Sequence, residues 1–401
     1  MKKIINVSAR DLVEFIFKQG SINNLFQGIS RNKEGISVHK KIQGSYIKEE
    51  FSKEVFLSHE IEYEDFILKI SGRADGIWKS LLGYKVEEIK STSHPLEKID
   101  ESFYHVHLAQ AKVYAYIFSL EENLNKIDIK LTYYNILNEE IKILEFNFSI
   151  DELTEFFNDL INRYLKWINF SLSFIKLRNE KLKKLEFPYR EYRKGQRDFA
   201  IRVFKAIKDS KNIYCEAPTG IGKTISTVFP SLKALAEDLC DRIFYLTSKN
   251  MTSKVAEETL LKINENGGSV RFIKITAKEK ICPLEECNCN PEGCSYAVNY
   301  FDKINDVVFE IISNNINLTK ELIKAYSNKY NLCPFELTLD LSNHADFIIC
   351  DYNYLFDIRV YLKRFFENIS ERYVFLIDEC HNLIDRAREM YSCEIRKKDV
   401  L

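Results

Sequence analysis

The stretch Glu216-Ala217-Pro218-Thr219-Gly220-Ile221-Gly222-Lys223-Thr224 decides how the second half of the chain is interpreted. Its glycines let the backbone wrap closely around phosphates, so that N–H groups and a helix N-terminus face the anion. Lys223 would reach the β- and γ-phosphates, and the Thr224 hydroxyl would bind Mg²⁺. The apolar runs at 212–215 and 225–239 predict a strand before this loop and a helix after it. We therefore predict a nucleotide site lined by Ala217, Pro218, Thr219, Gly220, Ile221, Gly222, Lys223 and Thr224.

A pair of carboxylates follows a later apolar run, in Val374-Phe375-Leu376-Ile377-Asp378-Glu379-Cys380-His381. Similar short runs at 242–247 and 347–350 are typical of buried parallel strands. Ligands of open α/β sheets bind at the carboxyl ends of the strands. We expect Asp378 to hold Mg²⁺ there and Glu379 to orient and deprotonate the attacking water.

Length and composition limit the class of protein. The 401 residues are enough for two or three domains, and 45% hydrophobic with 29% charged residues indicates a globular protein with a substantial core. The net charge of −1 excludes a uniformly basic surface, so nucleic-acid binding would need local patches. The start of the chain does not resemble a signal peptide, and no apolar run approaches a membrane span. We expect a cytoplasmic protein without membrane contact.

One local patch lies at 176–197, where nine basic and three acidic residues give a charge of +6. Charge runs of this kind are usually solvated helix ends or linkers. The alternative is a strip that faces the phosphates of DNA between two DNA-handling domains. The sequence leaves both interpretations open.

The motifs of the second half resemble the DinG/XPD type of iron-sulfur helicase in superfamily 2, which tolerates Ala217 at the first loop position. The resemblance rests on Ala-Pro-Thr-Gly-Ile-Gly-Lys-Thr at 217–224, Asp-Glu-Cys-His at 378–381 and the cysteines between them. It implies a RecA-like lobe that uses ATP. Pro188-Tyr189-Arg190-Glu191-Tyr192-Arg193-Lys194-Gly195-Gln196 resembles the family's upstream segment, which implies that Gln196 lies near the adenine. Phe244-Tyr245-Leu246-Thr247-Ser248-Lys249 resembles motif Ia, which implies that Thr247 and Lys249 touch single-stranded DNA.

The cysteines are unevenly placed, because none of the ten precedes Cys215 and five lie from Cys282 to Cys333. Such clustering outside an oxidising compartment favours metal or cluster ligation over disulfides. The family resemblance implies a 4Fe-4S cluster in an insert at about 276–340. We expect Cys282, Cys289, Cys294 and Cys333 to be its ligands, with Cys287 as an alternative to Cys289. Spacing alone does not choose the metal, so structural zinc remains possible in principle.

A second set of polar residues lies in the first half of the chain. Strands at 75–78 and 84–90 can form a hairpin whose turn centres on 81 and 82, which places Asp75 opposite Glu88. Glu88 and Lys90 are two residues apart and project from the same face of the strand. Two carboxylates bind Mg²⁺ or Mn²⁺, which activates a water for attack on phosphate, and an ammonium group positions that water.

This arrangement resembles the PD-(D/E)XK nucleases, in particular the RecB-like branch, over about 35–135. The resemblance implies that His39 supports the metal held by Asp75 and Glu88. It also implies a Gln-x-x-x-Tyr pair, Gln110 and Tyr114, on the DNA-facing side. Ala74 stands where the family name has proline. His105 and His107 are rival ligands, although surface positions on the same helix are the simpler interpretation.

The predicted organisation is α/β throughout, with a nuclease-like domain at 1–175, a basic linker at 176–197 and a partial RecA-like lobe at 198–401. The second lobe and nearly all of the arch domain that the family requires are expected to be absent from these residues, so this chain alone should not unwind DNA. The predicted function is an ATP-dependent DNA helicase fused to a metal-dependent nuclease, acting on single-stranded or branched DNA in repair or recombination. The alternative is an ATP-gated DNA-end binding module with an inactive nuclease fold.

Overall fold

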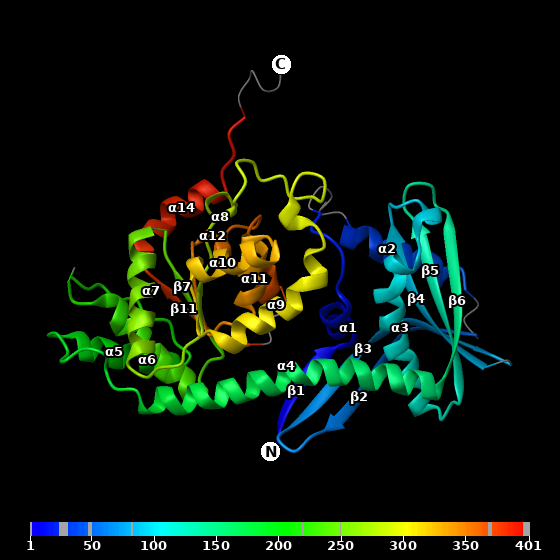
Figure 1. Ribbon diagram of the computed structural model, residues 1–401, viewed down its shortest axis with the longest axis horizontal. Coiled ribbons are helices and arrows are strands. Elements are labelled where there is room, and N and C mark those ends of the chain that lie inside the picture. The colour runs from blue at the N-terminus through cyan, green and yellow to red at the C-terminus, as the bar shows by residue number, and fades with distance from the viewer. Residues whose placement is uncertain are drawn as a thin grey trace. The chain divides into compact units, whose positions relative to one another are not determined.

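The computed structural model describes residues 2–23, 31–46, 50–81, 83–218, 220–248, 250–367 and 371–395. The chain divides into two compact units, Met1–Ile168 and Asn169–Leu401, and the boundary falls inside the long helix α4. Figure 1 shows both units, and each is described by itself below. Among the described residues, no helix is both long enough and apolar enough to span a bilayer.

The first unit is a mixed sheet with helices. Its strands are β1 (Lys3–Ser8), β2 (Phe51–Glu62), β3 (Phe66–Ser80), β4 (Gly83–Thr92), β5 (Lys126–Asn135) and β6 (Ile141–Ser149). Its helices are α1 (Ala9–Phe17), α2 (Arg31–Gly44), α3 (Glu101–Glu121) and the start of α4 (Ile150–Lys184), with a 3₁₀ turn at Leu96–Lys98. The sheet order is β1-β3-β4-β5-β6, and β2 pairs with β3.

Strand β3 is the centre of this sheet and changes partner along one edge. Its first half pairs with β1 in parallel, its last five residues pair with β4 in antiparallel, and β2 runs along the other edge. The pairing with β1 ends at Ser71 and the pairing with β4 begins at Gly76. Between these residues, β3 has no paired strand at the edge that faces β1 and β4. A fork of this kind opens a place where side chains can reach between two strands. Asp75 lies in this fork.

Local sequence explains the flanking helices. The Ser8 hydroxyl accepts the Asp11 N–H at 2.9 Å and so caps the N-terminus of α1. Helix α3 covers β4 and β5 (Figure 1), and Ala109, Ala111, Val113 and Ala115 are among its buried residues. Because these residues are spread around the helix, α3 is enclosed on more than one side.

The second unit is built on a parallel sheet in the order β11-β7-β10-β8-β9. Its strands are β7 (Arg242–Leu246), β8 (Phe272–Lys274), β9 (Asn317–Leu318), β10 (Phe347–Cys350) and β11 (Tyr373–Ile377). Its helices are α5 (Gln196–Lys208), α6 (Lys223–Ala236), α7 (Asn250–Glu265), α8 (Lys278–Ile281), α9 (Tyr300–Asn314), α10 (Lys320–Tyr330), α11 (Pro334–Ser342), α12 (Asn353–Phe356), α13 (Lys363–Phe366) and α14 (Leu383–Met390). Strands β7 and β10 are completely buried. The sequence of β10 is apolar throughout, as expected of a buried parallel strand, whereas β7 begins with Arg242, whose guanidinium donates to the carbonyls of Ser342 and Ala345.

Two predictions about this unit need correction. Residues 212–215 do not form a strand: they are irregular and exposed, with Tyr214 88% accessible. A strand needs a neighbour that takes its backbone hydrogen bonds, and these residues pair with no strand in the described part of the sheet. The linker predicted at 176–197 is not wholly irregular, because α4 continues to Lys184 and its first nine residues are therefore helical.

The basic residues of 176–197 are exposed, with one exception. Arg178 is only 5% accessible and forms a buried ion pair with Asp346, whose second oxygen accepts the Arg271 N–H at 2.9 Å. This residue therefore belongs to the core of the lobe. The other basic residues remain available as a surface patch.

Candidate functional site

The hairpin of β3 and β4 has the register that the sequence predicts. Gly76 pairs with Glu87 and Ser80 pairs with Gly83, and continuing the same register places Asp75 opposite Glu88. The Asp75 Oδ2 atom accepts the backbone N–H of Ile89 at 2.6 Å, so this side chain satisfies the strand backbone at the fork. Lys90 Nζ lies 2.7 Å from Glu88 Oε1. The structure therefore brings Asp75, Glu88 and Lys90 to one place.

Helix α2 brings His39 to the same place. Its residues Val38 and Ile42 are buried against Ile89 and Tyr134 of the sheet, which fixes the rotation of the helix. His39 Nδ1 then lies 3.3 Å from Asp75 Oδ1, and this hydrogen-bonded contact raises the histidine pKa despite partial burial.

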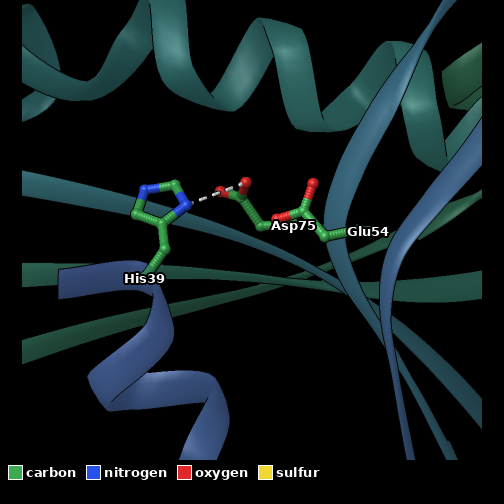
Figure 2. Close-up of side chains that lie close together, drawn as sticks. All are labelled: His39, Glu54 and Asp75. Atoms are coloured by element: carbon green, nitrogen blue, oxygen red, sulfur yellow. Dashed lines mark ion pairs between the residues drawn. The ribbon is translucent and has the colours of Figure 1, made fainter. Parts of the chain in front are cut away.

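A carboxylate that the sequence analysis missed completes this group. Ligand atoms of His39, Glu54 and Asp75 all lie within 4.8 Å of one another, and Figure 2 shows the three side chains converging from α2, β2 and β3. Glu54 has a positive φ of 53°, a conformation that non-glycine residues rarely adopt. The signal that could have found it is the second hairpin, because the observed register of β2 and β3 continues with Glu54 opposite Asp75.

Glu88 is a buried carboxylate with one oxygen left over. Its exposure is 2%, and Oε2 has no hydrogen-bond partner among the described residues. Burial raises the pKa of this carboxyl to about 7, while Lys90 opposes the shift and Asp75 adds to it. An orphaned buried carboxylate oxygen is costly, and a cation beside it would remove that cost.

The predicted DNA-facing pair, Gln110 and Tyr114, lies behind Lys90. Gln110 and Tyr114 are 7% and 3% accessible, so they do not present a surface to a polymer. Gln110 Oε1 lies 3.4 Å from Lys90 Nζ, and its Nε2 lies 3.4 Å from the Tyr114 hydroxyl. Tyr114 in turn packs directly on Gly72, where a Cβ would lie 2.6 Å from the tyrosine oxygen. The expected contact with DNA is therefore corrected to a supporting position behind the lysine.

The rival histidines point elsewhere. His105 Nε2 contacts the Phe17 carbonyl at 2.8 Å, and His107 Nδ1 contacts the Tyr133 hydroxyl at 2.7 Å. Burial lowers the His107 pKa to about 3, so this imidazole is neutral. Neither residue belongs to the group of potential metal ligands around Asp75.

The second site is a cleft of about 1050 Å³ in the other unit. Its lining includes Ala217, Lys223, Thr224, Asp378 and Glu379, the residues predicted to handle a nucleotide. Positive φ angles at Gly220 (84°) and Gly222 (82°) shape the loop, and α6 begins at Lys223. Lys223 Nζ lies 3.4 Å from Glu379 Oε1, which brings the two sequence motifs together.

Tyr245 links these motifs from the buried strand β7, a contact that the sequence analysis did not anticipate. Its hydroxyl hydrogen-bonds the side chains of Thr224 and Asp378. Burial raises the Asp378 pKa, and the hydrogen bond from Tyr245 opposes this. From the sequence alone, a tyrosine within an apolar strand is expected to be a buried packing residue. Its contact with Asp378 depends on the tertiary structure and could not be predicted.

Other predicted contacts lie apart from the cleft. Gln196 is 3% accessible; its Oε1 accepts the Arg193 N–H at 3.0 Å, and its Nε2 lies 3.5 Å from the Gly222 carbonyl, so it braces the loop. Thr247, expected to touch DNA, is 4% accessible and its hydroxyl is paired with Thr252, which corrects that prediction for its side chain. Pro218 and Ile221 flank the loop turn, whereas Thr219 and Lys249 lie outside the described residues.

All ten cysteines lie in described segments and are free thiols. Cys287 interacts with Cys282 and Cys289, while Cys289 interacts with Cys333. Cys294 is joined to this group through the backbone, because the Cys333 N–H donates to the carbonyl of Tyr296 at 3.1 Å, two residues after Cys294. The five thiols are therefore gathered in one region, and the structure does not separate Cys287 from Cys289.

The spacing of these thiols bears on the choice of metal. Thiolates on one tetrahedral Zn²⁺ lie about 3.8 Å apart, given a Zn–S distance of about 2.3 Å. No three of the described cysteine sulfurs lie within 4.8 Å of one another. A cluster binds each thiolate through a different iron, so its cysteines stand further apart. The five thiols are donors that either an iron-sulfur cluster or a zinc ion accepts.

Comparisons with known proteins match both halves. Residues 18–197 match the PD-(D/E)XK nuclease superfamily, and residues 252–400 match DEAD_2. The regulator of telomere elongation helicase 1 homolog of Aedes aegypti is 25% identical over 279 residues, which cover 54% of this chain and 27% of that protein. The probable ATP-dependent helicase MJ0942 of Methanocaldococcus jannaschii is 39% identical over 49 residues, or 12% of this chain and 8% of that protein. A solved structure titled XPD_Helicase aligns over 50% of this chain and 34% of that chain, with 21% identity and a TM-score of 0.36. The match thus spans about a quarter of the Aedes relative's length.

Proposed function

Because the chain is a DinG/XPD-type superfamily 2 helicase with an N-terminal PD-(D/E)XK nuclease-like domain, we propose that it couples metal-dependent cleavage of DNA to an ATP-driven motor. The nuclease half of the proposal depends on one observation. This is the buried Glu88 Oε2 atom, which has no protein partner in the described structure and stands beside Asp75 and Lys90. A carboxylate held in this way fits a divalent cation.

The residues around Glu88 divide the work of hydrolysis between them. Asp75 and Glu88 would hold Mg²⁺ or Mn²⁺, and His39 would support the same centre. When bound, the cation lowers the pKa of the attacking water and neutralises charge on the scissile phosphate. Lys90 positions that water and stabilises the negative charge that develops as the new P–O bond forms and the old one breaks. Gln110 orients the lysine through its 3.4 Å contact.

The positions of the charged and polar residues in the nucleotide cleft support ATP hydrolysis. Lys223 would leave Glu379 to bind the β- and γ-phosphates, which frees the carboxylate to orient the attacking water. Thr224 and Asp378 would hold the Mg²⁺ that accompanies ATP. Tyr245 keeps these two ligands together through its hydroxyl.

The cysteine region would hold a 4Fe-4S cluster through Cys282, Cys289, Cys294 and Cys333, with Cys287 as the alternative to Cys289. The proximity of the thiols supports this assignment. We also propose that the protein acts on DNA in repair or recombination.

The proposal is tested with labelled single-stranded DNA and Mn²⁺ in the absence of ATP, using the full chain. We expect the wild type to cut, and we expect Glu88→Gln and Lys90→Ala to lose at least about a hundredfold in rate, the scale of a lost general-acid/base or charge-stabilising group. Lys69→Ala is the matched control, because Lys69 is an exposed lysine of β3 paired with Glu60 at 2.7 Å. Tight binding without products would instead support a DNA-end binding module with an inactive nuclease fold.

A further inference from the structure

The backbone of one carboxylate in the nucleotide cleft has an uncommon conformation. Glu379 has a φ of 52° and a ψ of 45°, in the left-handed region that residues other than glycine rarely adopt. Its carboxylate lines the cleft and lies 3.4 Å from Lys223 Nζ. A residue stays in this conformation only where the surrounding structure compensates for its cost. The contacts that hold the backbone of Glu379 therefore bear on where its carboxylate lies.

A buried tyrosine provides two of these contacts. Tyr352 lies two residues after β10 and is 0% accessible. Its hydroxyl donates to the main-chain carbonyl of Asp378 and also lies 3.3 Å from the carbonyl of Glu379. Successive carbonyls of an extended strand point to opposite sides, so one hydroxyl cannot reach both of them. The left-handed conformation of Glu379 brings the two carbonyls to the same side, where Tyr352 meets them.

Two further residues support this arrangement. The carbonyl of Glu379 accepts the main-chain N–H of Asn382 at 3.0 Å and its side-chain Nδ2 at 3.1 Å. The Ser248 side chain hydrogen-bonds the Tyr352 hydroxyl and so helps to fix its orientation. Asn382 holds only the carbonyl that follows Glu379, whereas Tyr352 contacts the peptide groups on both sides of this residue. Tyr352 therefore sets the backbone turn at Glu379 and, with it, the direction of the side chain.

We propose that Tyr352 is a positioning residue for ATP hydrolysis, because its hydroxyl holds the backbone of Glu379 so that the carboxylate faces the attacking water. The inference rests on the proposed motor function and deepens it by one residue. Among the described residues that line the cleft, Glu379 is present and Tyr352 is not. Loss of the hydroxyl should therefore slow the chemical step and leave the binding of ATP unchanged. A small displacement of a catalytic group can cost up to about a hundredfold in rate.

The test measures hydrolysis of radiolabelled ATP by the full chain with Mg²⁺, in steady state and in single turnovers. Tyr352→Phe removes only the hydroxyl. Tyr300→Phe is the matched control, because Tyr300 is equally buried in the same unit and its hydroxyl donates to Asp340 Oδ2 at 2.9 Å. Circular dichroism establishes that each variant is folded. If Tyr352→Phe is not folded, Asn382→Leu replaces it, since this change removes the 3.1 Å contact with the carbonyl of Glu379.

We expect Tyr352→Phe to lower kcat at least about tenfold with an unchanged KM for ATP, while Tyr300→Phe matches the wild type. In a Glu379→Gln background, Tyr352→Phe should lower the single-turnover rate no further, because the hydroxyl acts through this carboxylate. A further loss in that background would overturn the inference. An unchanged kcat, a rise in KM alone or an equal loss in Tyr300→Phe would overturn it as well.

The same measurements separate this inference from the proposed function. If Glu379→Gln slows hydrolysis but the folded Tyr352→Phe does not, the motor function stands and only the role of Tyr352 is lost. If the wild type does not hydrolyse ATP, or if Glu379→Gln is as fast as the wild type, the proposed function of the cleft fails and the inference fails with it.

Discussion

Adjacent glutamates on β4 allow a sharp test, because the same substitution should have opposite effects on stability. Glu87 and Glu88 point to opposite faces of the strand and are 0% and 2% accessible. Glu87 accepts from Tyr46 at 2.9 Å and from Trp78 at 2.7 Å, and it also pairs with Thr132 and Lys130. Glu88 has a free oxygen. We predict that Glu87→Gln destabilises the metal-free domain and that Glu88→Gln stabilises it.

The expected gain in stability for Glu88→Gln follows from the pKa of Glu88, which burial raises from its ordinary value of 4.5 to about 7. The folded state therefore holds a proton that the unfolded state has released between pH 4.5 and 7. Stability from this group is complete below pH 4.5 and is lost as the pH rises to about 7. At pH 8 the buried charge costs about 3 kcal/mol, and Glu88→Gln should recover about this amount.

For Glu87→Gln, the free energy of unfolding should change in the opposite direction. An amide cannot accept from all of the donors around Glu87, and it leaves the ammonium of Lys130 without its anionic partner at 3.1 Å. Lys130 Nζ also sits 5.0 Å from the Trp78 ring centroid, so the disturbance reaches the aromatic packing. Breaking a buried pair in this way typically costs 3–5 kcal/mol. We expect Glu87→Gln to lose about 3 kcal/mol.

Urea denaturation at pH 8 with EDTA measures both effects. The chain has two tryptophans, Trp78 and Trp167, and both lie in the first unit, so tryptophan fluorescence reports on that unit alone. Mn²⁺ should then stabilise the wild type but not Glu88→Gln. DNA cleavage is measured in parallel, and we expect Glu87→Gln to retain it at temperatures where it is folded.

Two results would refute the reasoning. If Glu88→Gln is less stable than the wild type in EDTA, its carboxylate is satisfied in the metal-free protein and the argument for a cation site is lost. If Glu87→Gln is as stable as the wild type, the pattern of donors around Glu87 does not hold the domain together.

Three further outcomes are expected. Arg178→Ala leaves the Asp346 carboxylate buried without its cation and should cost the second unit 3–5 kcal/mol, seen as a lowered melting transition by calorimetry. Tyr245→Phe removes the hydroxyl that joins the two Mg²⁺-binding side chains, and ATP hydrolysis should fall about tenfold in kcat/KM, with an unchanged value counting against the cleft assignment. His107 stays neutral in the fold with a pKa of about 3, so acidification below pH 6.5 should remove up to about 1.4 kcal/mol per pH unit, and His107→Gln in the Glu88→Gln background should flatten that slope in urea titrations.

The sequence predicted the nuclease-like group where local rules were enough. The two-residue turn fixed the β3–β4 register, and alternation along β4 then placed Glu88 and Lys90 on one face. Glu54 was missed because no motif marks it, although the β2–β3 hairpin would have placed it by the same rule.

Features that depend on tertiary packing could not be predicted in this way. Tyr114 was expected to face DNA, but close packing of α3 over Gly72 buries it. The β-rich composition of 212–215 favours a strand, yet strand formation requires a partner that these residues do not have among the described strands. The side-chain link from Tyr245 to Asp378 likewise exists only because β7 and β11 are neighbours in the sheet.

The most direct measurement of the central claim is a crystal structure of the full chain soaked in Mn²⁺, with anomalous diffraction recorded at the manganese edge. The account predicts an anomalous peak between the carboxylates of Asp75 and Glu88, with Glu88 Oε2 as a ligand. Manganese that binds elsewhere, with no ion beside Glu88 Oε2, would contradict it.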